Sequence, residues 1–212
     1  MLDLLLNGFV TLFVIVDPLG LIPLFLAVTP GVDQKGRIAI AMRACLLALA
    51  ILSVFALVGL SLLQTLGISL GAFRVAGGLF LFWIGFELVF ERRKERHQKS
   101  ADRAVAENDD IADVAAFPLA IPLIAGPGAI SAVILLSGQL PSVIGKAGVI
   151  ATIALALAVT FACLAVAHRI DGLLGATGRA VISRLLGVVL AALAVQFVAD
   201  GAIQLFDINT AR

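Results

Sequence analysis

Two proline-containing motifs interrupt apolar stretches of the chain, and their residue types are those that bind small charged groups. The first is Asp17-Pro18-Leu19-Gly20 and the second is Gly126-Pro127-Gly128-Ala129. Proline lacks a backbone donor and clashes with the preceding helical turn, so a continuous helix is not expected through either motif. A capping residue followed by proline instead predicts that a new helix begins at each motif.

A helix that begins inside an apolar stretch presents uncovered backbone N–H groups and a partial charge of about +0.5. We therefore expect the N–H groups of Leu19, Gly20, Gly128 and Ala129 to bind an anion or a carboxylate. The Asp17 carboxylate would bind the amino group of the substrate or the coupling cation, H⁺ or Na⁺. All eight residues of the two motifs form the predicted substrate-binding site. The alternative is that both motifs are kinks covered by neighbouring helices and that Asp17 only caps a helix.

The sequence offers no comparable support for an enzyme. Residues 67–71 fit the G-x-S-x-G pattern of hydrolases, but that pattern needs a strand-to-helix turn and a general base. Both histidines, His97 and His168, are expected on the opposite side of the membrane from these residues. Since P-loop, H-E-x-x-H and dinucleotide motifs are also absent from the sequence, we expect no catalytic residue, metal site or cofactor.

The composition is that of a membrane protein. Of 212 residues, 61% are hydrophobic and 14% are charged, and the mean hydropathy is +1.13. Soluble domains are about 45–50% apolar and about 25% charged. The expected surroundings are therefore a lipid bilayer. A net charge of +1, without a basic face, argues against a nucleic-acid partner.

Six hydrophobic segments approach or exceed the roughly 20 residues that span a bilayer, which predicts an all-α membrane protein. We place a turn at residues 64–67, between the second and third segments. The hydrophilic residues 91–113 form a predicted cytoplasmic loop between two three-helix halves, residues 1–90 and 114–212. The segments are residues 2–28, 38–66, 68–90, 114–137, 147–168 and 180–206.

The two halves repeat each other in sequence. Pro18 in the first segment corresponds to Pro127 in the fourth, and residues 74–77 in the third correspond to residues 184–187 in the sixth. Because each half has three spans, the second half must lie upside down relative to the first. We therefore predict two inverted three-helix repeats, with helices 1 and 4 broken at mid-membrane, an architecture typical of secondary transporters.

Small and charged residues within the spans have ordinary expected roles. Glycines in the third and sixth segments are expected to let helices approach closely. These are Gly77, Gly78, Gly85 and Gly187. No role is expected for the acidic residues Glu87 and Asp200.

The distribution of Lys and Arg predicts the orientation. With the loops numbered alternately, one side of the membrane collects nearly all basic residues, and the other keeps Arg74, Lys146 and Arg212. The basic side of a membrane protein is cytoplasmic. Both chain termini are therefore predicted on the outer side, periplasmic or extracellular.

The chain resembles the MarC family of integral membrane proteins, which includes the SnatA-type neutral amino-acid transporters. The matching stretches are DPLGLIPLFLAV (17–28), LGISLGAFRVAGGLFLFWIGFELVF (66–90), FPLAIPLIAGPGAIS (117–131) and ISRLLGVVLAALAVQFVADGA (182–202). The resemblance implies a six-helix protein of the cell inner membrane. For SnatA-like members it implies symport of small neutral amino acids, such as glycine and alanine, with an ion.

The function predicted on these grounds is secondary transport of small neutral amino acids. One alternative is a non-transporting membrane protein of the MarC type with a structural or envelope role. Another is an exporter of other small metabolites. The sequence leaves the coupling ion and the oligomeric state open, and a homo-oligomer is compatible with it.

Single cysteines test the predicted orientation. In a variant lacking Cys45 and Cys163, we expect Gln98→Cys and Lys146→Cys to react from opposite faces of the membrane, because they belong to oppositely placed loops. Reaction of Gln98→Cys with an impermeant maleimide added outside intact cells would contradict the orientation.

Overall fold

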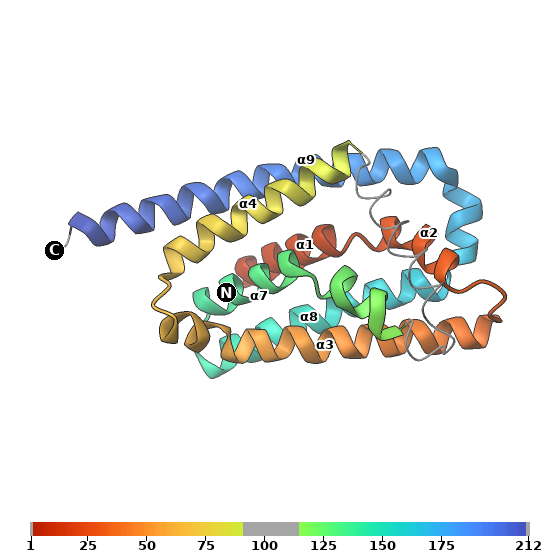
Figure 1. Ribbon diagram of the computed structural model, residues 1–212, viewed down its shortest axis with the longest axis horizontal. Helices are drawn as coiled ribbons and strands as arrows, with labels where there is room; N and C mark the ends of the chain where they lie inside the picture. The colour runs from red at the N-terminus through yellow and green to blue at the C-terminus, as the bar shows by residue number, and fades with distance from the viewer. Residues whose placement is uncertain (1, 91–114, 211–212) are drawn as a thin grey trace.

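The computed structural model describes residues 2–90 and 115–210, and every regular element in these residues is a helix (Figure 1). The first half contains α1 (Leu2–Val16), α2 (Pro18–Val28), α3 (Gln34–Thr65) and α4 (Leu70–Val89). The second half contains the π-helix η1 (Ala115–Ile124), α7 (Pro127–Gln139), α8 (Val143–Ala165) and α9 (Ala167–Thr210). The expected loop at residues 91–113 lies outside the described residues.

Five stretches of helix are long and apolar enough to cross a membrane: Leu2–Val28, Gln34–Thr65, Leu70–Val89, Val143–Ala165 and Ala180–Phe206. They match five of the six predicted segments. The remaining segment, residues 114–137, is divided into η1 and α7, and α7 has only 13 residues. The division follows from a sequence rich in proline, which cannot sustain a regular ladder of helical hydrogen bonds.

Two of the helices begin earlier than predicted, because polar caps extend them. Asp33 caps α3, its Oδ1 accepting a hydrogen bond from the Gly36 N–H at 2.9 Å. Ser142 caps α8, its Oγ accepting from the Gly145 N–H at 3.0 Å. The turn predicted at residues 64–67 begins two residues later, because α3 continues to Thr65, and Gly67 in the turn has φ 69°.

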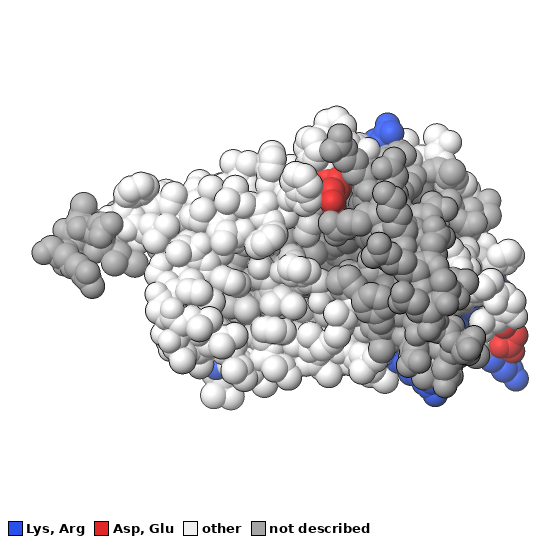
Figure 2. All heavy atoms as spheres, in the orientation of Figure 1, with Lys and Arg blue, Asp and Glu red and all other residues white. Residues whose placement is uncertain are grey.

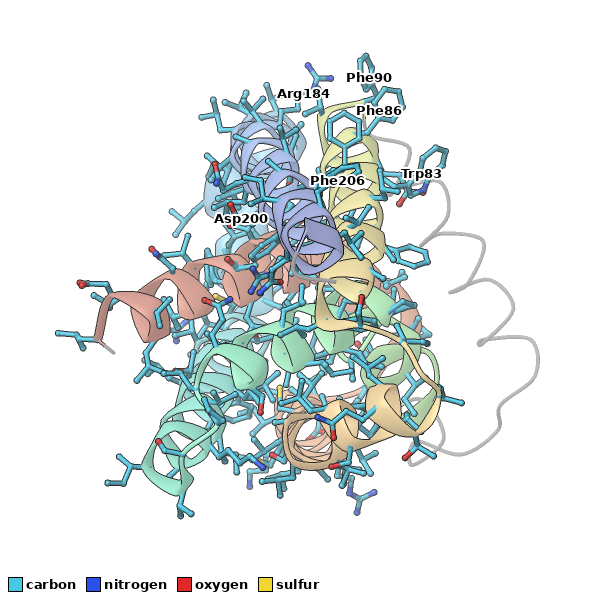
Figure 3. The ribbon with its side chains drawn as sticks, turned by 90° about the vertical axis from the view of Figure 1, so that its left-hand side faces the viewer. Trp83, Phe86, Phe90, Arg184, Asp200 and Phe206 are labelled. Carbon is cyan, nitrogen blue, oxygen red and sulfur yellow. The ribbon has the colours of Figure 1, made fainter. Side chains whose placement is uncertain are left out.

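The helices form three layers (Figures 1 and 3). One outer layer pairs α3 with α8, the other pairs α4 with α9, and the central layer contains α1, α2, η1 and α7. Of the five spans, Leu2–Val28 is the most enclosed, since 61% of its most apolar 18 residues are buried. The corresponding value for Ala180–Phe206 is 22%. The two proline-containing motifs therefore lie in the layer that other helices cover on both sides.

The contact between α4 and α9 is a seam of small residues in antiparallel register. Along the seam, small residues lie seven apart on both helices, at 71, 78 and 85 and at 201, 194 and 187. A Cβ added to the α4 member of each pair would lie 2.9–3.1 Å from the backbone carbonyl oxygen of its partner. The pairs are Gly71 with Gly201, Gly78 with Ala194 and Gly85 with Gly187. The expected packing role of Gly78, Gly85 and Gly187 is therefore visible as backbone contact.

Gly85→Ala tests the seam, because the added methyl group would meet the backbone of Ala191 and Gly187 at 2.9 Å. We expect a loss of stability of about 1–3 kcal/mol, the usual range for overpacking, measured as a lower melting temperature in detergent. Gly77→Ala is the matched control, since its methyl group would lie 3.3 Å from the side chains of Ser131 and Leu135. Both substitutions change helix propensity by the same amount. Equal melting temperatures of the two variants would therefore contradict close backbone contact between α4 and α9 at Gly85.

Candidate functional site

The first motif interrupts the helix at a single residue. Asp17 separates α1 from α2 with φ 50° and ψ 67°, and it is the one non-glycine residue with positive φ in the described part of the chain. Its N–H still donates to the Phe13 carbonyl, and its carbonyl still accepts from the Leu21 N–H, both at 3.0 Å. Aspartate is one of the few residue types that adopt this left-handed conformation.

The Asp17 carboxylate is enclosed within the bundle. Asp17 is 3% exposed. Its Oδ1 accepts a hydrogen bond from the Gly20 N–H at 3.1 Å, and its Oδ2 accepts from Ser183 Oγ of α9 at 3.4 Å. A Cβ on Gly20 would collide with the carboxylate, so glycine at this position lets the cap form. An ionisable group at this depth is costly and in membrane proteins usually marks a functional site.

The second motif interrupts the helix in a different way. At the end of η1, the Ala125 N–H donates to the Ala120 carbonyl at 2.9 Å, a π-type bond across five residues. Gly126 is extended, with φ −80° and ψ 174°, and α7 begins at Pro127. Since Gly126 has no side chain, it makes no side-chain cap for α7. The two helix N-termini therefore differ. The Asp17 carboxylate caps α2, whereas the residue before α7 is a glycine and offers no capping side chain.

The structure brings parts of the two motifs together. A Cβ on Gly128 would lie 3.4 Å from Cγ2 of Ile15, which lies two residues before Asp17. The same Cβ would lie 2.5 Å from Cδ1 of Ile84, so an α4 side chain occupies the space in front of Gly128. The first turn of α7 thus packs against the end of α1.

The eight predicted site residues differ in burial. Asp17, Pro18, Gly128 and Ala129 are buried, and Leu19, Gly20 and Gly126 are half-buried. Pro127 is exposed, so it does not face the centre of the bundle together with the others.

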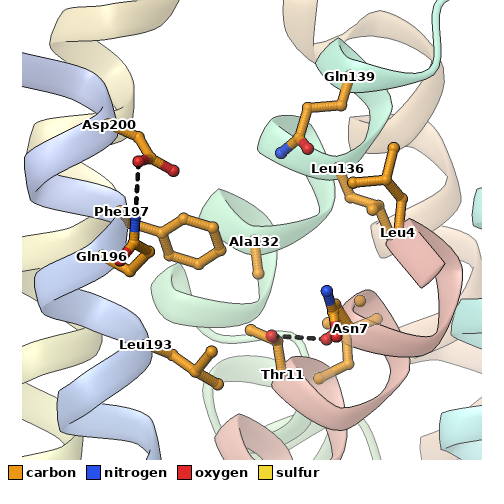
Figure 4. Close-up of a pocket in the computed structure, with 12 residues that line it drawn as sticks. Leu4, Asn7, Thr11, Ala132, Leu136, Gln139, Leu193, Gln196, Phe197 and Asp200 are labelled. Atoms are coloured by element: carbon orange, nitrogen blue, oxygen red, sulfur yellow. Dashed lines mark hydrogen bonds between the residues drawn. The ribbon is translucent and has the colours of Figure 1, made fainter. Parts of the chain in front are cut away.

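A cavity of about 270 Å³ lies between α1, α7 and α9, beyond the first motif (Figure 4). Thr11 on its wall precedes Asp17 by six residues, which is about 9 Å along a helix. This cavity was not expected from the sequence. A signal was present, because Asn7 and Thr11, and likewise Gln196 and Asp200, are spaced four apart and share a helix face. The two pairs are far apart in the chain, and nothing in the sequence indicates that the α1 face and the α9 face meet.

Residues 2–206 match a family described as MarC family integral membrane protein. The UPF0056 membrane protein YvbG of Bacillus subtilis is 36% identical over 211 residues, covering 99% of both chains. The UPF0056 membrane protein MJ1677 of Methanocaldococcus jannaschii is 35% identical over 195 residues, covering 92% of this chain and 93% of that one. The UPF0056 membrane protein YhcE of Escherichia coli is 32% identical over 196 residues, covering 91% of this chain and 89% of that one.

No solved structure matches the chain. The family match covers nearly the whole chain, and the three relatives match 91–99% of it. Together with the five apolar helices of spanning length, these similarities establish that the chain belongs to the MarC family of integral membrane proteins.

Proposed function

We propose that this protein is a secondary transporter of small neutral amino acids, with glycine and alanine as substrates and an H⁺ or Na⁺ gradient as the driving force. The observation that carries the proposal is the Asp17 carboxylate, 3% exposed at an interrupted helix that packs against a second interrupted helix. Charged groups at this depth are typical of substrate and ion pathways. In this proposal the protein is not an enzyme and needs no cofactor.

The proposed architecture is a pair of inverted repeats with breaks at mid-membrane. The layers support it, because each contains corresponding helices from both halves of the chain: α3 with α8, α4 with α9, and α1–α2 with η1–α7. Corresponding helices of an inverted repeat cross the membrane in opposite directions, and the seam between α4 and α9 is antiparallel. Transporters built in this way place their site where the broken helices meet.

The two helix N-termini suggest different parts in binding. The N-terminus of α7 has no side-chain cap from Gly126, so its N–H groups at Gly128 and Ala129 are proposed to bind the substrate carboxylate. The N-terminus of α2 is capped by Asp17, which is proposed to bind the ammonium group or the coupling cation. Protonation of Asp17 would weaken its bond to the Gly20 N–H, which would couple the ion to the opening of this cap.

The proposed location is the cell inner membrane, with both termini on the outer side. Lys and Arg support this orientation, because on the face seen in Figure 2 they gather toward the end of the bundle where α3 begins. That end corresponds to the predicted cytoplasmic side, where basic residues collect.

Two observations favour a non-transporting role as the second candidate. The Asp17 carboxylate already has a hydrogen-bonding role as a cap, and Ile84 fills the space in front of Gly128. In that case both breaks would be structural, as in a membrane protein with an envelope role. An exporter of other small metabolites would share the proposed site and differ in its substrate.

Uptake into proteoliposomes tests the proposal, with labelled glycine and alanine and an imposed gradient of H⁺ or of Na⁺. We expect gradient-driven uptake by the unaltered protein. We expect Asp17→Asn to abolish it, because the substitution keeps the shape of the cap and removes the charge. Asp33→Asn is the matched control, since Asp33 caps α3 in the same way at an exposed position and should leave uptake unchanged.

Two results would contradict the proposal. The first is absence of uptake with either gradient by a protein that is folded and inserted. The second is undiminished uptake by Asp17→Asn, which would limit Asp17 to capping and favour the structural role.

A further inference from the structure

We propose that the cavity between α1, α7 and α9 is a binding site for a small primary ammonium compound, whose charged group is held by Asp200. The ligand class comprises short aliphatic amines and small amino acids. The inference goes beyond the proposed function, because binding in this cavity requires neither the two helix breaks nor an ion gradient.

Polar side chains from three helices converge on this cavity. Asn7 and Thr11 come from α1, Gln139 from α7, and Gln196 and Asp200 from α9. In a membrane protein such groups face the interior of the bundle or water, since contact with lipid is costly. The cavity is an open pocket that combines these polar groups with a larger apolar lining, which suits a ligand with a charged end and an apolar part.

The cavity lies at one end of the bundle. Asp200 adjoins Gly201, which contacts Gly71 near the start of α4. Gln139 is the last residue of α7, and Asn7 is in the second turn of α1. This is the end that the distribution of Lys and Arg assigns to the outer side of the membrane.

The charge of the lining selects a cation. Asp200 is the one charged residue among those lining the cavity. Its Oδ1 accepts a hydrogen bond from Gln196 Nε2 at 2.7 Å, which orients the carboxylate and leaves Oδ2 for a ligand. Figure 4 shows Asp200 and Gln196 on one wall, with Gln139 and Asn7 on the other. The amide N–H groups of that second wall can bind the carboxylate of an amino acid.

The remaining lining favours an organic cation over a metal ion. Phe197 and Leu136 provide apolar wall beside the polar groups. No group of three or more His, Cys, Asp or Glu residues that could hold a metal occurs in the described residues. The cavity volume of about 270 Å³ is slightly smaller than the roughly 300–1,000 Å³ of pockets for drug-sized ligands, and it suits a compound of amino-acid size.

Site-directed labelling tests whether the cavity binds an amine. In the full chain carrying Cys45→Ala and Cys163→Ala, we introduce Gln139→Cys and measure its rate of reaction with a maleimide. Propylamine, protonated at pH 7, should slow the reaction in a saturable manner. Val143→Cys is the matched control, because it is 85% exposed at the same end of the bundle and outside the cavity, and its rate should not change.

The role of Asp200 is tested in the same assay. With Asp200→Asn, the concentration of propylamine needed for protection should rise by about tenfold or more, as expected for loss of a charge-assisted hydrogen bond. Asp3→Asn, which removes an exposed carboxylate from the first turn of α1, should leave it unchanged. Melting temperatures verify that the variants are folded. If Asp200→Asn does not fold, propionate and NaCl are compared with propylamine in the protein that retains Asp200. Neither should slow the reaction of Gln139→Cys with the maleimide.

The outcomes separate this site from the proposed transport site. Protection that persists in Asp17→Asn supports a separate amine site, even if uptake is absent. Three results overturn the proposal: no protection by propylamine, equal protection by propionate or NaCl, or unchanged protection in a folded Asp200→Asn variant. If uptake proceeds while propylamine gives no protection, the proposed function stands and the cavity site is wrong.

Discussion

A helix that crosses a lipid bilayer can lose its hydrogen-bonding ladder only where protein or enclosed water covers the exposed backbone groups. Two proline-containing interruptions impose this constraint on the present chain, and the rest of the fold satisfies it. Asp17 closes the first interruption with its own carboxylate, bonded to the Gly20 N–H. The π-type bond of Ala125 closes one side of the second. Both interruptions lie in the central of three helical layers.

Close backbone packing holds one of the two outer layers together. The layer of α4 and α9 brings backbones into contact through a seam of small residues, and the close approach fixes the position of α9 along α4. That position places Ser183 against the Asp17 carboxylate and Asp200 beside the cavity. One helix therefore contacts both the proposed transport site and the proposed amine site. Because the seam fixes the helix, a change in its register would move the two positions together.

Sequence reasoning predicted the parts of this fold that depend on local chemistry. Hydrophobic length identified five spans, and Asp before Pro identified the start of a helix at Pro18 with Asp17 as its cap. Gly before Pro likewise identified the start of a helix at Pro127. The sequence did not indicate that the preceding residues form a π-helix, because the stability of such a segment depends on its neighbours. It also gave Asp200 no role. The partners of Asp200 across the cavity come from α1 and α7, and only the three-dimensional arrangement brings them together.

The proposed function depends on the binding of a small amino acid where the two interruptions adjoin. Hydrogen–deuterium exchange of peptides covering residues 120–131 tests it most directly, because the uncapped N–H groups of Gly128 and Ala129 lie within them. If alanine binds there in the presence of the coupling ion, it slows the exchange of these N–H groups, and propylamine does not. Exchange that is the same with and without alanine, in protein that is folded and inserted, would contradict the claim.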